Sequence, residues 1–317
     1  MVVHTKRVFY MKYLADSSYA DILASRPDIT LDNIENCGTY AAVQPILAAA
    51  HVYQITSARD EIDRELYADT PLLTRAPNLL AVSTNGVGYD TVNLRACTEA
   101  GVLVVNQAGG NSEAVAEHVL GMMLCLSKRI IQADRFMRRE SNFDRESFMG
   151  IEILRKTIGI VGIGHVGSRV AELCRGLFAM RVLACDPYLT EAEIAARGAE
   201  KIELDDLLRQ ADYVSINCPL TDETRGMIGT RQYALMQPHA YFITTARGLI
   251  HDEEVLAEAL RERRIAGAGL DVMEHDSQEA VASHPDDPAA RLVLAKVYHS
   301  AQRWDDALVA YDEAIEH

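Results

Sequence analysis

One stretch, TIGIVGIGHVGSRVAELCRGL, restricts the fold of this chain more than any other feature. Its apolar start, residues 157–161, has the pattern of a buried strand, and it runs through Gly162, Gly164 and Gly167 directly into an amphipathic helix. A strand, a glycine-rich turn and a helix in this order are typical of dinucleotide-binding βαβ units, in which a pyrophosphate lies on the helix N-terminus. The sequence therefore predicts a parallel α/β sheet with a nucleotide site at the carboxyl end of this strand.

Each glycine of the turn has its own reason to lack a side chain. Gly162 permits the tight turn, Gly164 lets the backbone approach a pyrophosphate, and Gly167 lets the helix pack closely on the strand. His165 and Val166 lie between Gly164 and Gly167 and are the first residues of the predicted helix. We therefore expect both residues beside the phosphates.

An acidic residue ends the next predicted strand, RVLACDPY, a little over twenty residues beyond the turn. This residue is Asp186. A carboxylate at this place accepts hydrogen bonds from the adenosine ribose and repels a 2′-phosphate. The expected cofactor is therefore NAD rather than NADP.

Strands and helices alternate along most of the chain, as in parallel sheets that are covered by helices on both faces. The predicted fold class is α/β: a Rossmann-type doubly wound parallel sheet and a smaller flavodoxin-like α/β domain, with a short C-terminal α-hairpin. A helix is expected at residues 18–25, and strands are expected within residues 7–13, 51–58, 79–86, 102–109, 157–164, 181–188, 211–220, 240–246 and 267–272.

The same alternation predicts the domain boundaries. We expect a substrate domain at residues 1–105 and an NAD-binding domain at residues 106–276. Residues 111–138 are expected to form one long helix, because Asn111 or Ser112 can cap it, apolar residues recur at helical spacing and basic residues collect at its end. Such a helix would bridge the two domains or pack against a partner subunit.

Composition and charge exclude several classes of protein. The chain has 317 residues and a formal net charge of −15, without a Lys/Arg stripe, so nucleic acid and anionic membranes are not expected partners. It has no apolar stretch of signal length at its start and no run of eighteen apolar residues, which predicts a cytoplasmic protein. Its six cysteines lack a CxxC pair or metal-like spacing, which predicts reduced thiols and no metal site.

Three later stretches, NCPLTDETRGMI, TTARGLIHDEEVLAEAL and AGAGLDVMEHD, resemble the D-isomer-specific 2-hydroxyacid dehydrogenases. The stretch NGVGYDTVNLRACTEAGVLVVNQAGGNSEAVAEH is similar to the same family's substrate loop and bridging helix. The resemblance covers about residues 5–276. It implies hydride transfer between NAD(H) and a small 2-hydroxy or 2-keto acid, in a homodimer built on the helix at 111–138.

The resemblance also assigns site residues. Arg247 matches the arginine that grips the substrate carboxylate with two parallel hydrogen bonds, with a surface ion pair as the alternative. The amides of Val87 and Gly88 match the loop on the carboxylate's other side, with Asn111 nearby, and Asp271 matches the carboxylate that binds the nicotinamide amide. Cofactor-wall positions match Cys218, Pro219, Thr224, Thr245 and Ala246, of which Cys218 and Ala246 could instead be core residues.

The family pattern breaks after Asp271. The family places a glutamate and a proline there, followed by a strand that ends in Pro-His, and this histidine protonates the carbonyl while the glutamate raises its pKa. Here Asp276 occupies the glutamate position, Ser277 follows it, and no Pro-His occurs in residues 277–317. His299 is a candidate substitute acid, but it falls within a predicted helix, and His284 lies in a polar linker.

Residues 288–316 resemble one tetratricopeptide repeat, and the alternative is a simple amphipathic helical hairpin. A linker at 277–287 precedes this hairpin at 288–317, which a gene fusion or an altered reading frame would both explain. Two functions follow: a dehydrogenase impaired by loss of its acid, or a non-catalytic NAD-responsive protein whose hairpin recruits a protein partner. The matching positions are Leu294, Ala295, Tyr298, Ala307, Tyr311 and Ala314.

Overall fold

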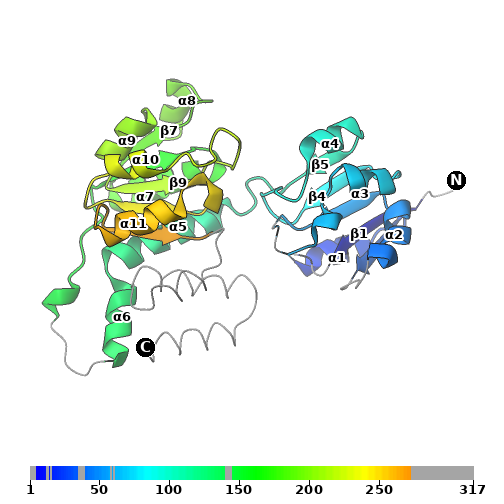
Figure 1. Cartoon of the computed structure of the whole chain (residues 1–317), viewed down its shortest axis with the longest axis horizontal. Coiled ribbons are helices and arrows are strands. Elements are labelled where there is room, and N and C mark those ends of the chain that lie inside the picture. The colour runs from blue at the N-terminus through cyan, green and yellow to red at the C-terminus, as the bar shows by residue number, and fades with distance from the viewer. Residues whose placement is uncertain are drawn as a thin grey trace. The chain divides into compact units, whose positions relative to one another are not determined.

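The computed structural model describes residues 5–11, 14, 16–34, 40–57, 59, 61–139 and 145–272. These residues fall into two compact units that divide between Asn111 and Ser112 (Figure 1). The predicted linker and hairpin, with Asp276, His284 and His299, lie outside the described residues.

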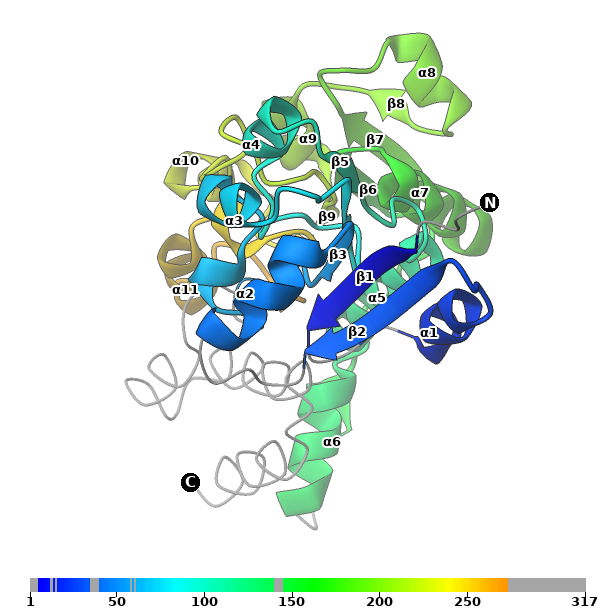
Figure 2. The same cartoon turned by 90° about the vertical axis from the view of Figure 1, so that its right-hand side faces the viewer.

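The first unit is a five-stranded parallel sheet in the order β2-β1-β3-β4-β5. This strand order is the flavodoxin-like one, so the fold expected for this unit is confirmed. Figure 2 shows β1 and β2 side by side, with α1 next to β2. Its elements are β1 Lys6–Met11, α1 Ser17–Ala24, β2 Ile29–Ile34, α2 Tyr40–Ala49, β3 Val52–Ile55, η1 Arg64–Leu66, α3 Thr70–Arg75, β4 Ala81–Thr84, α4 Leu94–Glu99 and β5 Leu103–Val105.

The edge strand β2 was missing from the sequence-based prediction. Its sequence, ITLDNI, carries Asp32 and Asn33 where a buried strand would carry apolar residues. Asp32 forms an ion pair with Arg7 of β1 at 2.6 Å, so the polar residue faces a partner on the neighbouring strand. Of the β2 side chains only Ile34, at its end, belongs to the core of the unit, in which the rings of Phe9 and Tyr53 stack with their centroids 4.2 Å apart.

The second unit is a six-stranded parallel sheet in the order β11-β10-β9-β6-β7-β8. The strand order runs outward from β6 in both directions, as in a doubly wound Rossmann sheet. The five strands that the sequence predicted here are confirmed, and β8 is an additional two-residue strand. The elements are α5 Ser112–Ser127, α6 Ile130–Arg139, η2 Glu146–Phe148, β6 Thr157–Val161, α7 His165–Phe178, β7 Arg181–Cys185, α8 Glu191–Ala196, β8 Glu200–Lys201, α9 Leu204–Gln210, β9 Tyr213–Ile216, α10 Thr230–Leu235, β10 Tyr241–Thr244, η3 Gly248–Ile250, α11 Glu253–Arg261 and β11 Gly267–Leu270.

Both faces of this sheet are buried. Tyr213 and Ile243 point into the cluster beneath α5 and α7, whereas their neighbours Val214 and Phe242 point into the cluster beneath α9, α10 and α11. Successive side chains of a strand alternate between the two faces, so both need apolar residues. This requirement explains the nearly continuous hydrophobic runs in the sequence.

The prediction of one long helix at 111–138 was wrong. Two helices, α5 and α6, occupy this region, and α6 projects away from the sheet (Figure 1). The backbone of Arg129 between them is left-handed, with φ 54°. The carbonyl of Ser127 accepts a hydrogen bond from the amide of Ile151 at 2.8 Å instead of continuing a helix. Gly150 allows this approach, because a Cβ there would lie 2.3 Å from the same carbonyl oxygen.

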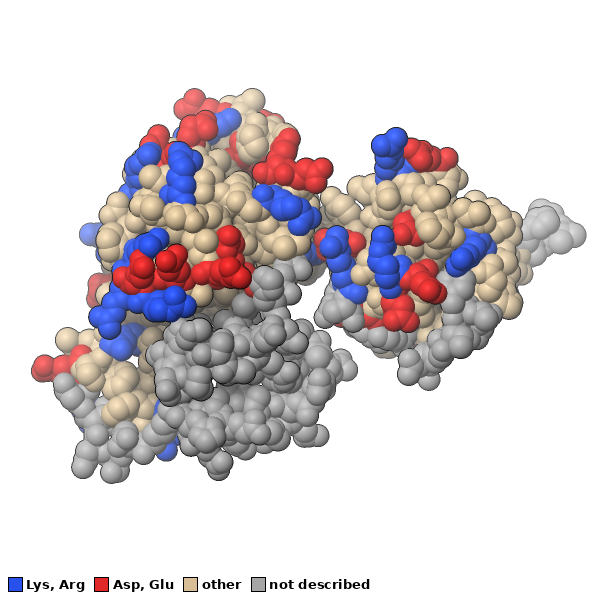
Figure 3. All heavy atoms as spheres, in the orientation of Figure 1, with Lys and Arg blue, Asp and Glu red and all other residues tan. Residues whose placement is uncertain are grey.

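The surface of the described residues is mixed in charge. On the face that Figure 3 displays, acidic and basic side chains are interspersed over both units. None of the described helices is both long and apolar enough to cross a bilayer.

Candidate functional site

The glycine turn connects β6 to α7 in the second unit. Gly162 has φ +85°, and a Cβ on it would lie 2.7 Å from the amide nitrogen of Cys218. A Cβ on Gly167 would lie 2.2 Å from the carbonyl oxygen of Gly162, so helix and turn are in backbone contact. A Cβ on Gly164 would meet nothing within 4 Å. The start of α7, where His165 and Val166 follow Gly164, therefore borders open space.

Asp186 lies directly beside this turn. It follows β7, and its two carboxylate oxygens accept hydrogen bonds from the amides of Ile163, at 3.2 Å, and Tyr188, at 3.1 Å. The carbonyl of Ile163 accepts from the Ser168 hydroxyl at 3.1 Å and from the Arg197 guanidinium. The backbone of Ile163, at the centre of the turn, is thus hydrogen-bonded to three side chains. Arg197 was not among the site residues predicted from the sequence, because only the folded chain brings the end of α8 to the turn.

The loop after β9 forms the opposite wall of the turn. Cys218 packs against Gly162, and burial raises the pKa of its thiol to about 11, so it is neutral at pH 7. Thr224 closes the loop on itself: its hydroxyl donates to the Pro219 carbonyl at 2.7 Å and accepts from the Thr221 amide at 2.8 Å. The structure therefore brings three of the predicted wall residues together in one loop.

Thr245, Ala246 and Arg247 follow β10 at the same edge of the sheet. All three are half-buried, and Arg247 Nη1 donates to the Ala246 carbonyl at 2.8 Å. Arg247 is also the N-cap residue of the short helix η3, which begins at Gly248. Its guanidinium is therefore placed by the end of a buried strand rather than by a long loop.

Asp271 follows β11, the next strand along this edge. Its amide donates to the Thr244 carbonyl at 2.9 Å, and its Oδ1 lies 3.7 Å from Nε2 of His118 on α5. His118 was not among the predicted site residues, although it ends the NSEAVAEH stretch. Since all six strands are parallel, the glycine turn, Arg247 and Asp271 share the carboxyl edge of one sheet, where ligands bind in folds of this type.

The remaining predicted residues belong to the first unit. Val87 and Gly88 follow β4, and the carbonyl of Val87 accepts from the Asn106 side chain at 2.8 Å. Val87 and Asn111 are exposed. The loop therefore lies at the carboxyl edge of the sheet of its own unit, held by a residue that follows β5.

A cavity of about 390 Å³ lies in the same unit. Its two arginines are engaged: Arg64 pairs with Asp69 at 3.1 Å and lies over the Tyr67 ring, and Arg59 Nε donates to the Asp90 carbonyl at 3.3 Å. Within the described ranges, no three His, Cys, Asp or Glu side chains are grouped so that they could hold a metal ion.

His251 is a buried histidine just beyond η3. Only 4% of it is exposed, and neither ring nitrogen has a hydrogen-bond partner among the described residues. Burial lowers the pKa of the His251 imidazole, against the smaller opposing effects of Glu253 and Asp252. The folded chain therefore holds this ring in its neutral form.

We expect this burial to make stability depend on pH. The unfolded chain protonates His251 near its usual pKa of 6.5, whereas the folded chain does so only at lower pH, so the free energy of unfolding should fall as the pH drops below about 6.5. His251→Leu should remove this part of the dependence and stabilise the protein at pH 5.5, because the ring has no hydrogen bond to lose. Urea unfolding at pH 5.5 and 7.5 measures both effects. An equal loss of stability on acidification in the two proteins would contradict this reading.

Proteins of known function are similar to this chain over most of its length. The family model described as "D-isomer specific 2-hydroxyacid dehydrogenase, NAD binding domain" matches residues 120–294 and so extends beyond Asp276. A glyoxylate reductase of Aeropyrum pernix is 37% identical over 241 residues, which are 74% of this chain and 71% of that enzyme. A D-3-phosphoglycerate dehydrogenase of Archaeoglobus fulgidus is 38% identical over 224 residues, 71% of this chain but 41% of that protein.

The chain thus spans about two fifths of the length of the phosphoglycerate dehydrogenases that it matches. Among solved structures, a D-lactate dehydrogenase of Aquifex aeolicus in complex with NAD and lactic acid is 28% identical, with a TM-score of 0.72. The superposition covers 98% of this chain and 93% of that one.

Proposed function

Because this chain belongs to the D-isomer-specific 2-hydroxyacid dehydrogenase family, we propose that it transfers a hydride between NAD(H) and a small 2-hydroxy or 2-keto acid. The observation that carries the proposal is the shared carboxyl edge of the second unit's sheet. The glycine turn with Asp186, the arginine Arg247 and the carboxylate Asp271 all follow strands that end there.

The residues around the glycine turn fit NAD. The open space at Gly164 and the amides at the start of α7 suit a pyrophosphate, since the N-terminus of a fourteen-residue helix favours an anion. Asp186 would accept the ribose hydroxyls and Asp271 would hold the nicotinamide amide, with the wall made by the loop of Cys218, Pro219 and Thr224 and by Thr245 and Ala246. NAD, when bound, supplies or accepts the hydride.

The substrate carboxylate would be bound by Arg247. A guanidinium can donate two parallel hydrogen bonds to a carboxylate and stays charged at all relevant pH values. The family resemblance assigns the amides of Val87 and Gly88, together with Asn111, to the same carboxylate. With the carboxylate fixed in this way, the carbonyl carbon of the substrate would be oriented toward the hydride.

Reduction of a 2-keto acid also requires a proton donor for the carbonyl oxygen of the substrate. Residues 277–317 contain no Pro-His, and Asp276 is one methylene shorter than the glutamate expected there. A positioned general acid contributes about 10² to 10⁴ in rate. We therefore propose weak turnover alongside intact cofactor binding, with His299 the candidate substitute acid. Initial rates of NADH oxidation with glyoxylate or hydroxypyruvate test this.

The missing Pro-His also supports a second candidate function. In this alternative the chain binds NAD without catalysing a reaction, and the hairpin at 288–317 binds a protein partner or a second copy. Binding of NADH with no turnover of any 2-keto acid would favour it over the enzyme.

We further propose a cytoplasmic homodimer that is built on α5 and α6. Four exposed apolar side chains support it, Ile130 and Met137 on α6 and Met149 and Leu154 in the segment after it. Sedimentation of the purified chain at micromolar concentration tests it, and a monomer would contradict the proposal.

Cofactor choice should depend on Asp186. We expect NADH to bind at least tenfold more tightly than NADPH, about 1.4 kcal/mol, because the carboxylate accepts ribose hydroxyls and repels a 2′-phosphate. Asp186→Ala should erase this preference, and Asp186→Asn should reduce it while keeping one acceptor oxygen for the turn. Fluorescence titration with both nucleotides measures the effect, and equal affinities in the wild type would refute it.

A further inference from the structure

Two exposed side chains from different loops at the carboxyl edge of the second unit's sheet are hydrogen-bonded to each other. Tyr188 lies two residues beyond Asp186 after β7, and Glu223 lies in the loop after β9. The Tyr188 hydroxyl donates a hydrogen bond to the Glu223 carboxylate. This bond, together with the charge of Glu223, raises the pKa of the Tyr188 phenol, which therefore stays protonated and remains a donor. Because 77% of Tyr188 is exposed, little of its surface is packed against the protein.

The Tyr188–Glu223 hydrogen bond joins the loops that follow β7 and β9, the strands on either side of β6, where the strand order reverses. β7 and β9 are not neighbours: each pairs with β6, so their ends lie about 10 Å apart, two strand spacings. The glycine turn follows β6 and therefore lies between them. A dinucleotide on this edge must pass between the two walls that the Tyr188–Glu223 hydrogen bond connects.

Both ends of this bridge have a fixed backbone. The amide of Tyr188 donates to Asp186, and the loop that carries Glu223 is closed by the hydrogen bonds of Thr224 with Pro219 and Thr221. The bridge can therefore open and close by rotation of the two exposed side chains, without unfolding either loop.

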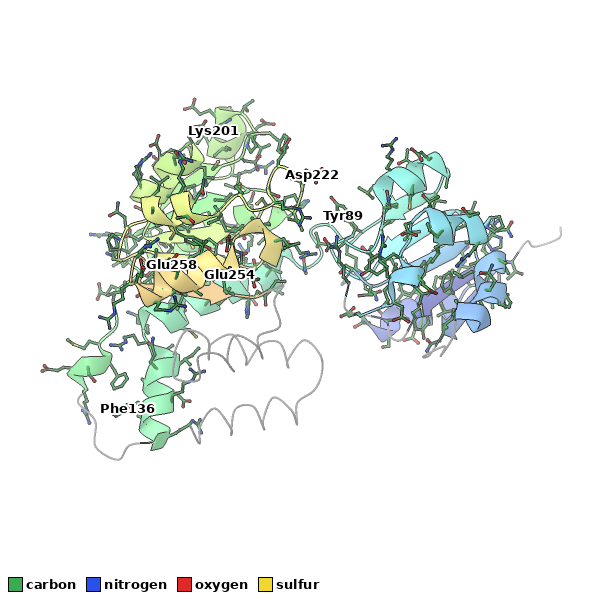
Figure 4. The ribbon with its side chains drawn as sticks, in the orientation of Figure 1. Tyr89, Phe136, Lys201, Asp222, Glu254 and Glu258 are labelled. Carbon is green, nitrogen blue, oxygen red and sulfur yellow. The ribbon has the colours of Figure 1, made fainter. Side chains whose placement is uncertain are left out.

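We infer that Tyr188 and Glu223 form a strap that closes over the adenosine end of a bound dinucleotide and slows its release. The inference rests on the proposed use of NAD(H), and it adds two residues that act through the cofactor's exit rather than on the reacting atoms. In this strap Glu223 acts through its hydrogen bond with Tyr188. Its neighbour Asp222, which is labelled in Figure 4, lies in the same loop but is not part of the strap.

The test is the dissociation rate of NADH, measured by stopped-flow fluorescence with an excess of NAD⁺ as the chase. Tyr188→Phe and Glu223→Ala should each raise this rate about threefold, because each removes the one solvent-exposed hydrogen bond that forms the strap. The double variant should release NADH no faster than either single variant, since all three lack the same bond. Glu223→Gln, which keeps an acceptor oxygen, should fall between the wild type and Glu223→Ala.

Asp222→Ala is the matched control, because it removes a carboxylate from the same loop without touching the strap. It should leave the release rate at the wild-type value. Binding of NADH with release unchanged by Tyr188→Phe, or with additive effects in the double variant, would overturn the strap alone. Failure of the wild type to bind NADH would overturn both the strap and the proposed function.

Discussion

Replacing residues 277–317 with a family-type segment that carries Pro-His is expected to raise turnover of hydroxypyruvate with NADH at least tenfold. The native segment lacks this dipeptide, and a positioned general acid accelerates proton transfer by about 10² to 10⁴. The gain should lie toward the low end of that range, because Asp276 is shorter than the glutamate that would orient the new imidazole. Initial rates of NADH oxidation at saturating NADH measure the change.

The matched control is the same replacement with the histidine of Pro-His changed to glutamine. It should keep the native rate, so that the gain is attributed to the imidazole and not to the exchange of segments. Native turnover within the ordinary range of about 1 to 10³ s⁻¹ would contradict the account if His299→Ala left it unchanged. In that case another group would supply the proton.

Arg247→Ala should lower kcat/KM for the same substrate by about 10² to 10⁴. The guanidinium would make two charge-assisted hydrogen bonds to the carboxylate, each worth about 1.5 to 3 kcal/mol, and its loss also leaves the carbonyl unoriented. The Pro-His chain is the better background for this measurement because its rates are higher. NADH affinity should not change, since Arg247 is assigned to the substrate.

Arg209→Ala is the control for the loss of an arginine. Arg209 lies on α9 and pairs with the exposed Asp206, so its loss should leave kcat/KM unchanged. A chain with Arg247→Ala that kept its kcat/KM would show that another cation binds the carboxylate.

Five of the six strands of the second unit could be predicted because they are buried on both faces, whereas the exposed β8 could not. Val214 and Phe242 point into one cluster while Tyr213 and Ile243 point into the other, so the sequence shows a continuous apolar run at each strand. The exposed edge of the first unit lacks this signal. There β2 replaces apolar residues with polar ones such as Asp32, whose partner Arg7 lies on the next strand.

The break between α5 and α6 could not be predicted for a different reason. The helical spacing of apolar residues continues through Arg129, so local periodicity favours one helix. The competing hydrogen bond comes from Ile151, more than twenty residues later, and it requires Gly150 to approach Ser127. Propensity within the segment does not contain that information.

The candidate site shows the same division. The glycine turn and Asp186 belong to one βαβ unit, so the number of residues between them could be recognised directly in the sequence. The contact of His118 with Asp271, that of Arg197 with Ile163 and that of Tyr188 with Glu223 each join residues from different elements. These pairs depend on the order of strands in the sheet, which residue patterns alone do not specify.

The central claim is that the chain transfers a hydride from NADH to a 2-keto acid, even if slowly. In the most direct measurement, the protein is incubated with an equimolar amount of NADH that carries deuterium at both C4 positions and with hydroxypyruvate. The product is separated by chiral chromatography and its deuterium content is measured by mass spectrometry. The account predicts glycerate of the D configuration with one deuterium at C2, and none from a chain with Arg247→Ala. Unlabelled or absent glycerate from a wild-type chain that has bound NADH would contradict the claim and favour the non-catalytic NAD-binding protein.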